Sequence, residues 1–167
     1  PEALVNLLLE ATPRQYGILL PKLRAHDQTA KGILKSKLDF KQPRIHAHAS
    51  VLLLQLNGDT ESLREALSTV EVPAPFPDLC TYMEDRLSRV MANSEKLLSE
   101  FKANPNGAYR AALVRSLGGM SHEKLNQELK TNLVATFEHL FQNDPDAAVH
   151  SASEWALRSW GEDALLA

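Results

Sequence analysis

The feature that most limits how this chain can fold is the regular placement of proline and glycine. Four segments begin with proline and end with glycine or asparagine, at residues 43–58, 77–93, 105–118 and 145–161. Proline suits the first turn of a helix, where its missing amide hydrogen is not needed, and glycine or asparagine after the last turn adopts the left-handed conformation. The segments start 34, 28 and 40 residues apart. This spacing predicts helices that belong to a repeated unit.

Shorter helical stretches are expected between these segments. Each begins near a Ser, Thr, Asn or Asp whose side chain can accept hydrogen bonds from the free amides of a first helical turn. Their ranges are 59–69, 93–103 and 121–143, and three more stretches precede the first repeat at 2–11, 13–26 and 28–39. No segment combines β-branched residues with an alternation of period two, and the abundant Leu and Ala favour helices. The sequence therefore predicts an all-α protein.

Helical periodicity indicates which faces are buried. At about 100° per residue, segment 145–161 gathers its apolar side chains on one arc and polar residues on the opposite side. That arc holds Ala148, Val149, Ala152, Trp155, Ala156, Leu157 and Trp160. Segment 121–143 has one apolar side and would be about 34 Å long as a single helix. Segment 43–58 is apolar around nearly its full circumference, so we expect this helix to be covered on both sides.

Helix pairs that recur every 28 to 40 residues are typical of an α-solenoid, in which each repeat covers the core of its neighbour. We therefore expect an α-α superhelix of stacked antiparallel helix pairs that forms one domain over residues 1–167. The chain begins at Pro1 and ends at Ala167, directly after an apolar run. We interpret it as a fragment of a longer protein.

The start of the last segment carries a family resemblance. Its Asp-Pro-Asp at 144–146, followed by Ala-Ala-Val, resembles HEAT-like repeats, whose second helix commonly begins with Asp-Pro-Asp before small or aliphatic residues. Asn-Pro-Asn at 104–106 is a weaker copy, whereas Gln-Pro at 42–43 and Phe-Pro at 76–77 depart further. The resemblance implies a HEAT-like solenoid, supported in its first two repeats more by spacing than by identity.

Two longer strings resemble repeat regions of large bacterial multidomain proteins. They are ATPRQYGILLPKL at 11–23 and DPDAAVHSASEWALRSWG at 144–161, about 31 of 167 residues near opposite ends of the chain. In those proteins the repeats accompany a Ser/Thr kinase-like domain or a formylglycine-generating-enzyme-like domain. The resemblance implies a place in a larger protein and assigns no activity to this piece.

The usual signatures of enzymatic chemistry are absent from the sequence. It contains no G-x-S-x-G, no P-loop, no G-x-G-x-x-G and no C-x-x-C. His122 begins a zinc-like H-E-x-x-H string, but Asn126 occupies the second histidine position, so a helix cap beside Ser121 explains His122 better. His46 and His48 point about 160° apart on a helix and cannot share a metal. We predict no catalytic residue, no metal site and no cofactor.

Three surface features are candidates for partner binding, and each has a simpler structural explanation. His150, Glu154 and Arg158 form either a binding strip or, as we favour, a solvated helix face. Trp155 and Trp160 suit a binding hot spot, but both fall on the apolar arc, which favours core packing. The first 44 residues are basic, without interleaved aromatic residues for base stacking, which favours a solvated face. Their cations are Arg14, Lys22, Arg24, Lys31, Lys35, Lys37, Lys41 and Arg44.

Charge and cysteine content narrow the partners and the compartment. A net charge of −3 gives no general attraction to phosphate backbones, so nucleic acid is an unlikely partner. The single cysteine, Cys80, cannot form an internal disulfide and is expected to be a small core residue, which favours a cytoplasmic protein. No apolar stretch approaches the roughly 20 residues that cross a membrane.

The sequence thus favours a non-catalytic protein–protein interaction, spacer or regulatory module within a larger multidomain bacterial protein. Its partner would be another protein or a neighbouring domain of the same chain, and the binding residues are unknown because superhelical geometry decides which face is concave. The alternative is a HEAT-like enzyme such as a DNA-lesion glycosylase. That enzyme needs a carboxylate, aromatic residues and a strongly basic concave face, which a net charge of −3 argues against.

Overall fold

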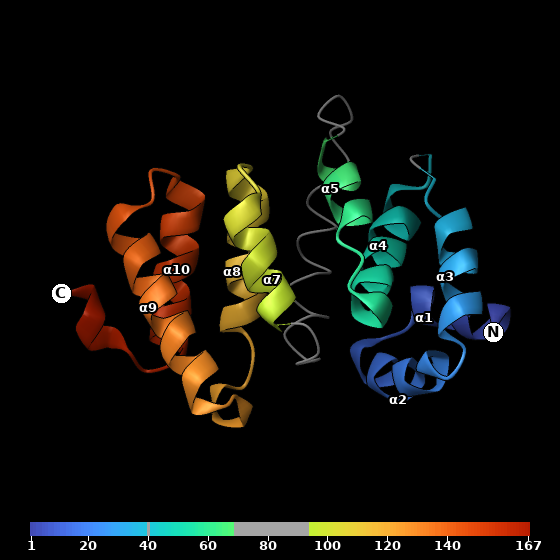
Figure 1. Cartoon of the computed structure of the whole chain (residues 1–167), viewed down its shortest axis with the longest axis horizontal. Coiled ribbons are helices and arrows are strands. Elements are labelled where there is room, and N and C mark those ends of the chain that lie inside the picture. Colours follow the sequence, from blue (N-terminus) through green and yellow to red (C-terminus); the bar gives the residue numbers. More distant parts are fainter. Residues whose placement is uncertain (40, 69–93) are drawn as a thin grey trace. The chain divides into compact units, whose positions relative to one another are not determined.

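The computed structural model describes residues 1–39, 41–68 and 94–167 and contains no strand within them. The chain divides into two compact units, Pro1–Arg86 (unit 1) and Leu87–Ala167 (unit 2), whose described parts are helices joined by short connections (Figure 1). The predicted all-α class is confirmed for the described residues. The helix predicted at 77–93, with Cys80, lies outside them. That residues 1–167 form one repeat domain stays a prediction.

Unit 1 contains five described helices close to the predicted ranges. They are α1 (Glu2–Glu10), α2 (Pro13–Arg24), α3 (Asp27–Ser36), α4 (Pro43–Asn57) and α5 (Glu61–Ser68). Thr12 caps α2 in a reciprocal arrangement with Gln15, in which each side chain accepts a hydrogen bond from the other residue's amide. Gly58 ends α4 with φ of 70°, as the Pro-to-Gly pattern predicts.

Helix α4 is the centre of unit 1. It packs against α1, α3 and α5, and every residue from His46 to Gln55 is buried. The prediction that this helix is covered on both sides is confirmed. Its buried polar side chains reach neighbouring helices: Nδ1 of His48 donates to the carbonyl oxygen of Leu9 at 2.6 Å, and the Tyr16 hydroxyl donates to Oε1 of Gln55. These bonds offset the cost of burying polar groups.

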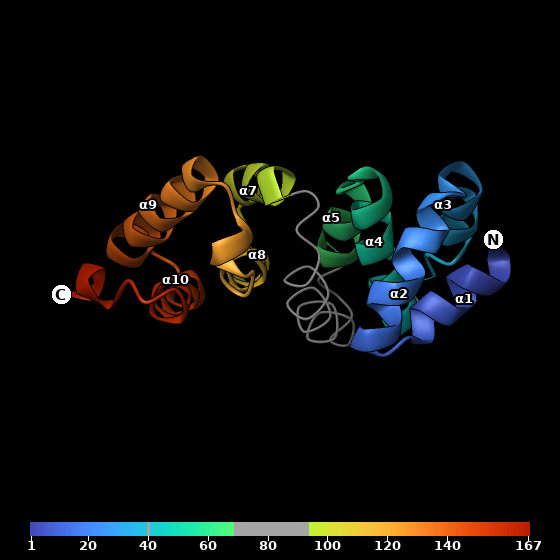
Figure 2. The same cartoon turned by 90° about the horizontal axis from the view of Figure 1, so that it is seen from below.

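Unit 2 has two layers of helices. Figure 2 shows α7 (Ser94–Ala103) and α9 (Gln127–Asn143) in one layer and α8 (Gly107–Gly118) and α10 (Ala147–Ser159) in the other. Helix α10 packs extensively on α8 and on α9, and α7 packs on α8. The described part of unit 2 also contains two short 3-10 helices, η1 (His122–Lys124) and η2 (Asp163–Leu166).

Helices α8 and α10 approach each other closely because small residues face each other. A Cβ atom added at Gly118 would lie 2.6 Å from Cβ of Ala156, closer than carbon atoms can pack. Trp160 lies beside this contact. Its Nε1 donates to the carbonyl oxygen of Gly118 at 2.7 Å, and its ring meets that of Phe137 edge-on, with the ring centres 5.3 Å apart. The core of unit 2 therefore depends on a small residue at one position and a large aromatic residue beside it.

The prediction that Pro105 and Pro145 occupy the first turns of their helices is wrong. Both helices start two residues after the proline, where Asn106 and Asp146 serve as N-caps. The Asn106 side chain accepts from the amide of Tyr109, and Asp146 accepts from two amides of α10. Asn and Asp form these bonds in an extended conformation, so the cap, not the proline, sets each start.

The predicted ends were also partly wrong. Gly118 is the last helical residue of α8, and Gly119 keeps a right-handed conformation, with φ of −77°. Among the described glycines, a positive φ occurs at Gly58 and Gly161. The left-handed glycine expected at the end of a helix therefore occurs in two of the predicted segments, 43–58 and 145–161.

The single long helix expected over 121–143 is interrupted. Residues His122–Lys124 form η1, and α9 begins only at Gln127, because the side chain of Asn126 accepts a hydrogen bond from the amide of Leu129 at 2.7 Å. With 17 residues, α9 is about 26 Å long instead of the expected 34 Å. A capping Asn in the middle of the apolar pattern divides the segment.

Candidate functional site

An open groove of about 1090 Å³ lies within unit 2, between α7, α8 and α9. Helix α7 contributes Leu98, Phe101 and Lys102, the first turn of α8 contributes Arg110, and the two proline-containing links contribute Asn104, Pro105, Asp144 and Pro145. One stripe of α9 forms the remaining wall. The groove is therefore lined by both apolar and polar side chains, which come from three helices and from the two links.

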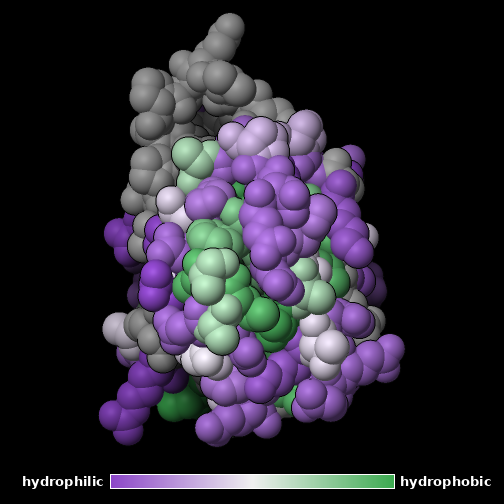
Figure 3. All heavy atoms as spheres, turned by 90° about the vertical axis from the view of Figure 1, so that its left-hand side faces the viewer, coloured by the Kyte–Doolittle hydropathy of each residue, from purple (hydrophilic) through white to green (hydrophobic). Residues whose placement is uncertain are grey.

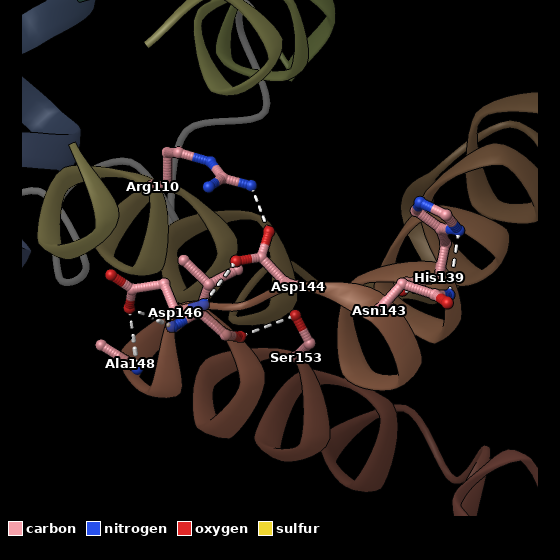
Figure 4. A network of polar contacts seen from close by, with 8 residues as sticks. Arg110, His139, Asn143, Asp144, Asp146, Ala148 and Ser153 are labelled. Atoms are coloured by element: carbon pink, nitrogen blue, oxygen red, sulfur yellow. Dashed lines mark hydrogen bonds and ion pairs between the residues drawn. The ribbon is translucent and has the colours of Figure 1, made fainter. Parts of the chain in front are cut away.

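A buried ion pair holds one side of the groove. The Arg110 guanidinium donates through Nη2 to Oδ2 of Asp144 (Figure 4). Its Cζ lies 4.7 Å from the centre of the Phe101 ring. The Asp144 side chain is 4% exposed and that of Arg110 18%. The other carboxylate oxygen of Asp144 accepts the amide of Asp146 at 3.0 Å. The guanidinium is therefore held in one orientation by a carboxylate and a ring.

The two links of unit 2 resemble each other. The amides of Asn106 and Asp146 donate to the side chains of Asn104 and Asp144 at 2.9 and 3.0 Å, so the links at 104–106 and 144–146 adopt the same local hydrogen-bonding pattern. Gly107 leaves room for the Asp146 side chain, because a Cβ atom there would overlap the Asp146 carboxylate.

The α9 wall is a stripe of residues at helical spacing. It consists of Asn132, Ala135, Thr136, His139, Leu140 and Asn143. The Thr136 hydroxyl donates to the Asn132 carbonyl oxygen, and the Asn143 amide nitrogen donates to the His139 carbonyl oxygen. His139 and Asn143 lie on neighbouring turns (Figure 4). The side chains of Asn132 and Asn143 are exposed at the two ends of this stripe.

The charged and titratable side chains of the groove are those of Lys102, Arg110, His139 and Asp144. Among its lining residues the one carboxylate is that of Asp144, and both of its oxygens already accept hydrogen bonds. The groove also offers a fixed guanidinium, the Lys102 amine and side-chain amides, which recognise carboxylates and peptide groups.

The histidines singled out in the sequence lie away from this groove. His46 and His48 are both buried in α4, and His48 bonds to the carbonyl of Leu9. No group of three or more potential metal ligands occurs in the part of the chain that the structure describes. His122 lies in η1, and its ring centre is 5.7 Å from that of Trp160, with the two planes tilted by 39°. Ser121 is the N-cap residue of η1, as expected, but its side chain makes no cap hydrogen bond.

The two tryptophans have different environments. Trp160 is buried as predicted, but Trp155 is 40% exposed, so the expectation that it packs in the core is wrong. The apolar arc of α10 is wider than the surface that α8 and α9 cover. The Trp155 ring lies at its edge, 5.9 Å from the guanidinium carbon of Arg115 and against the position of Gly118.

The strip His150–Glu154–Arg158 is not uniformly solvated. Arg158 is exposed and donates to Glu154 at 2.9 Å and to Asp163 at 3.1 Å, and the hydrogen bond to Glu154 raises the pKa of Arg158 further. His150 is half-buried, with its ring 4.6 Å from that of Phe141. The predicted solvated face therefore holds at its Arg158 end, whereas His150 packs against α9.

The basic residues of the first 44 positions lie on the surface of unit 1. Arg14, Lys22 and Arg24 of α2 are exposed. Lys35 pairs with Asp59 at 3.8 Å and Arg44 with Glu10 at 3.7 Å. These separations and exposures are those of weak surface ion pairs. The structure places these cations outside the groove, which the sequence analysis did not identify.

The apolar surface of unit 2 includes a patch on the side that carries the C-terminus. Figure 3 shows this face, where apolar residues are surrounded by hydrophilic ones. Leu165 and Leu166 of η2 are half-buried.

Comparison with protein-family models, with curated proteins and with solved structures finds no match to this chain. No helix among the described residues is long and apolar enough to cross a membrane.

Proposed function

We propose that this chain is a non-catalytic protein-interaction module of a larger protein, built as a HEAT-like α-solenoid, and that the groove of unit 2 is its binding site. The observation that carries the proposal is the groove itself, with its fixed Arg110 and the α9 stripe. A bacterial multidomain setting, with kinase-like or formylglycine-generating-enzyme-like neighbours, and a cytoplasmic location are proposed on the sequence resemblance and composition.

The construction of unit 2 supports the solenoid part of this proposal. Two helix pairs, α7–α8 and α9–α10, carry similar capped links 40 residues apart, and α8 and α10 pack side by side. Such an arrangement extends by adding pairs in the same direction. The apolar patch in Figure 3 suits such an addition.

A DNA-lesion glycosylase is the second candidate, because the groove brings together a carboxylate, an aromatic ring and two cations: Asp144, Phe101, Lys102 and Arg110. Two observations weigh against it. The carboxylate is already bonded to Arg110 and to the Asp146 amide. Residues 87–167 also contain ten acidic and eight basic residues, a net charge of −2 that repels a phosphate backbone.

A groove-filling substitution tests the proposal. Random peptides displayed on phage are selected against the immobilised chain and re-tested against Ala135→Trp, which places a large ring in the groove at an exposed helical position. The matched control is Gln142→Trp, an exposed α9 residue outside the groove. Peptides that bind wild type and Gln142→Trp but not Ala135→Trp support the proposal.

Absence of any peptide with that profile contradicts the proposed site. Release of a base from alkylated duplex DNA by the wild-type chain, lost in Asp144→Asn, would establish the glycosylase instead.

A further inference from the structure

We propose that the groove of unit 2 recognises an extended acidic segment of a partner protein, about five residues long, with Arg110 as the anchoring cation. This inference rests on the proposed function and adds the chemistry of the partner.

Arg110 has the properties of an anchor. The ion pair with Asp144 uses one nitrogen, Nη2, and the Phe101 ring supports the guanidinium plane. The structure gives Nε and Nη1 no acceptor among the described residues. A guanidinium that is mostly buried and already oriented forms stronger hydrogen bonds to a carboxylate than a solvated one does, because less ordering and less screening oppose them.

The charge balance of the groove favours an acidic ligand. Its lining contains two permanent cations, Lys102 and Arg110, against the single carboxylate of Asp144. Lys102 is exposed at the end of α7. The excess of one positive charge matches one or two carboxylates. Nucleic acid would need many phosphate contacts, which this groove and the net negative charge of residues 87–167 do not provide.

The α9 wall sets the length and conformation of the ligand. Its stripe runs from Asn132 to Asn143, and the eleven steps between these residues rise about 16 Å along the helix. An extended peptide covers that distance with about five residues. Amide side chains near both ends of the stripe can donate to and accept from peptide groups as a neighbouring strand does. Leu98 and the two link prolines offer contact for an apolar side chain next to the acidic one.

The experiment uses peptides that pass the Ala135→Trp and Gln142→Trp comparison above, so that only groove ligands are analysed. Sequencing of this pool should show Asp or Glu enriched at one or two adjacent positions. Affinities of individual synthetic peptides are then measured by fluorescence anisotropy, each against a version with Asn or Gln at those positions.

Charge variants of the chain identify the anchor. Asp144→Asn keeps an oxygen for the Asp146 amide but frees the guanidinium from its internal partner, so acidic peptides should bind about two to five times more tightly. Lys102→Glu should weaken binding by about the same factor, and the double variant Arg110→Gln, Asp144→Asn by about tenfold or more. Lys130→Glu, the same charge change on α9 outside the groove, should leave affinity unchanged.

The outcomes separate the two proposals. Groove ligands without acidic residues, or an Asp144→Asn variant that folds and binds acidic peptides less tightly, overturn the acidic-segment inference and leave the protein-interaction proposal standing. A selection with no groove ligand ends both. Saturable binding of duplex DNA that Lys102→Glu abolishes, without acidic peptides in the pool, replaces the peptide with nucleic acid.

Discussion

The two units solve the same packing problem with different residues. Unit 1 places one helix, α4, at its centre and buries it on all sides, together with polar groups that bond to α1, α2 and α5. Unit 2 distributes its core between two layers and brings α8 and α10 together through Gly118 and Ala156. Within the described residues, the groove lies in unit 2, where similar capped links occur at 104–106 and 144–146. A layered arrangement thus leaves a surface between helices available, whereas a central helix uses its whole surface for the core.

The largest effect should come from the centre of unit 1. Leu53→Ala removes a fully buried side chain from α4 and should lower the free energy of unfolding by about 2–5 kcal/mol. Leu7→Ala, the same substitution at a leucine of α1 that is 58% exposed, should change it by less than about 0.5 kcal/mol. Urea unfolding followed by circular dichroism gives both values. Equal losses would mean that α4 is not the centre of the unit.

In unit 2, a single added methyl group should be destabilising. Gly118→Ala places a Cβ atom against Ala156 and should cost about 1–3 kcal/mol, measured by the fluorescence of the adjacent Trp160 during urea unfolding. Adding Ala156→Gly should restore part of the loss, because it removes the other methyl group of the clash. A neutral Gly118→Ala would show that the close helix approach does not limit unit 2.

The capped links should contribute less. Asp146→Ala removes the side-chain acceptor for two amides of α10 and should cost about 1 kcal/mol. Gln42→Ala, at the N-cap of α4, should have almost no effect, because Gln42 makes no side-chain cap bond. Thermal unfolding of both variants tests this contrast between the units. Similar shifts in the two melting temperatures would contradict the expected difference.

The smallest effect should have the opposite sign. Gly32→Ala lies in the interior of α3, where an added Cβ meets nothing within 4 Å, and should stabilise the chain by about 0.5–1 kcal/mol through helix propensity. The same chemical change is thus expected to destabilise at Gly118 and stabilise at Gly32. A loss of stability at Gly32 in urea unfolding would show that α3 packs more tightly on that side than the structure has it.

The sequence predicted the helices better than their ends. The placement of proline, glycine and capping residues located α1 to α5 and α7 to α10, and the all-round apolar pattern of α4 correctly indicated burial on both sides. The starts of α8, α9 and α10 were misplaced because local hydrogen bonds from Asn106, Asn126 and Asp146 decide them, and these compete with proline and with hydrophobic pattern.

The groove could not be predicted in the same way. Its key contact joins Arg110 to Asp144, which are 34 residues apart, and depends on how α8 lies against the next link. The repeated tripeptides at 104–106 and 144–146 are the available signal, but in the sequence they indicate helix starts and a family resemblance, not a groove. Trp155 was placed in the core because a helical wheel gives a direction but not the width of the neighbouring surface.

The most direct test of the account is a nuclear magnetic resonance titration of the isotope-labelled chain with a groove-selected acidic peptide. We predict that backbone amide signals from Asn132 to Asn143 and the side-chain signals of Arg110 and Asn132 shift together and saturate with one peptide per chain. Shifts confined to the surroundings of Trp155 or to the basic surface of α2, with the α9 stripe unchanged, would contradict the assignment of this groove as the binding site.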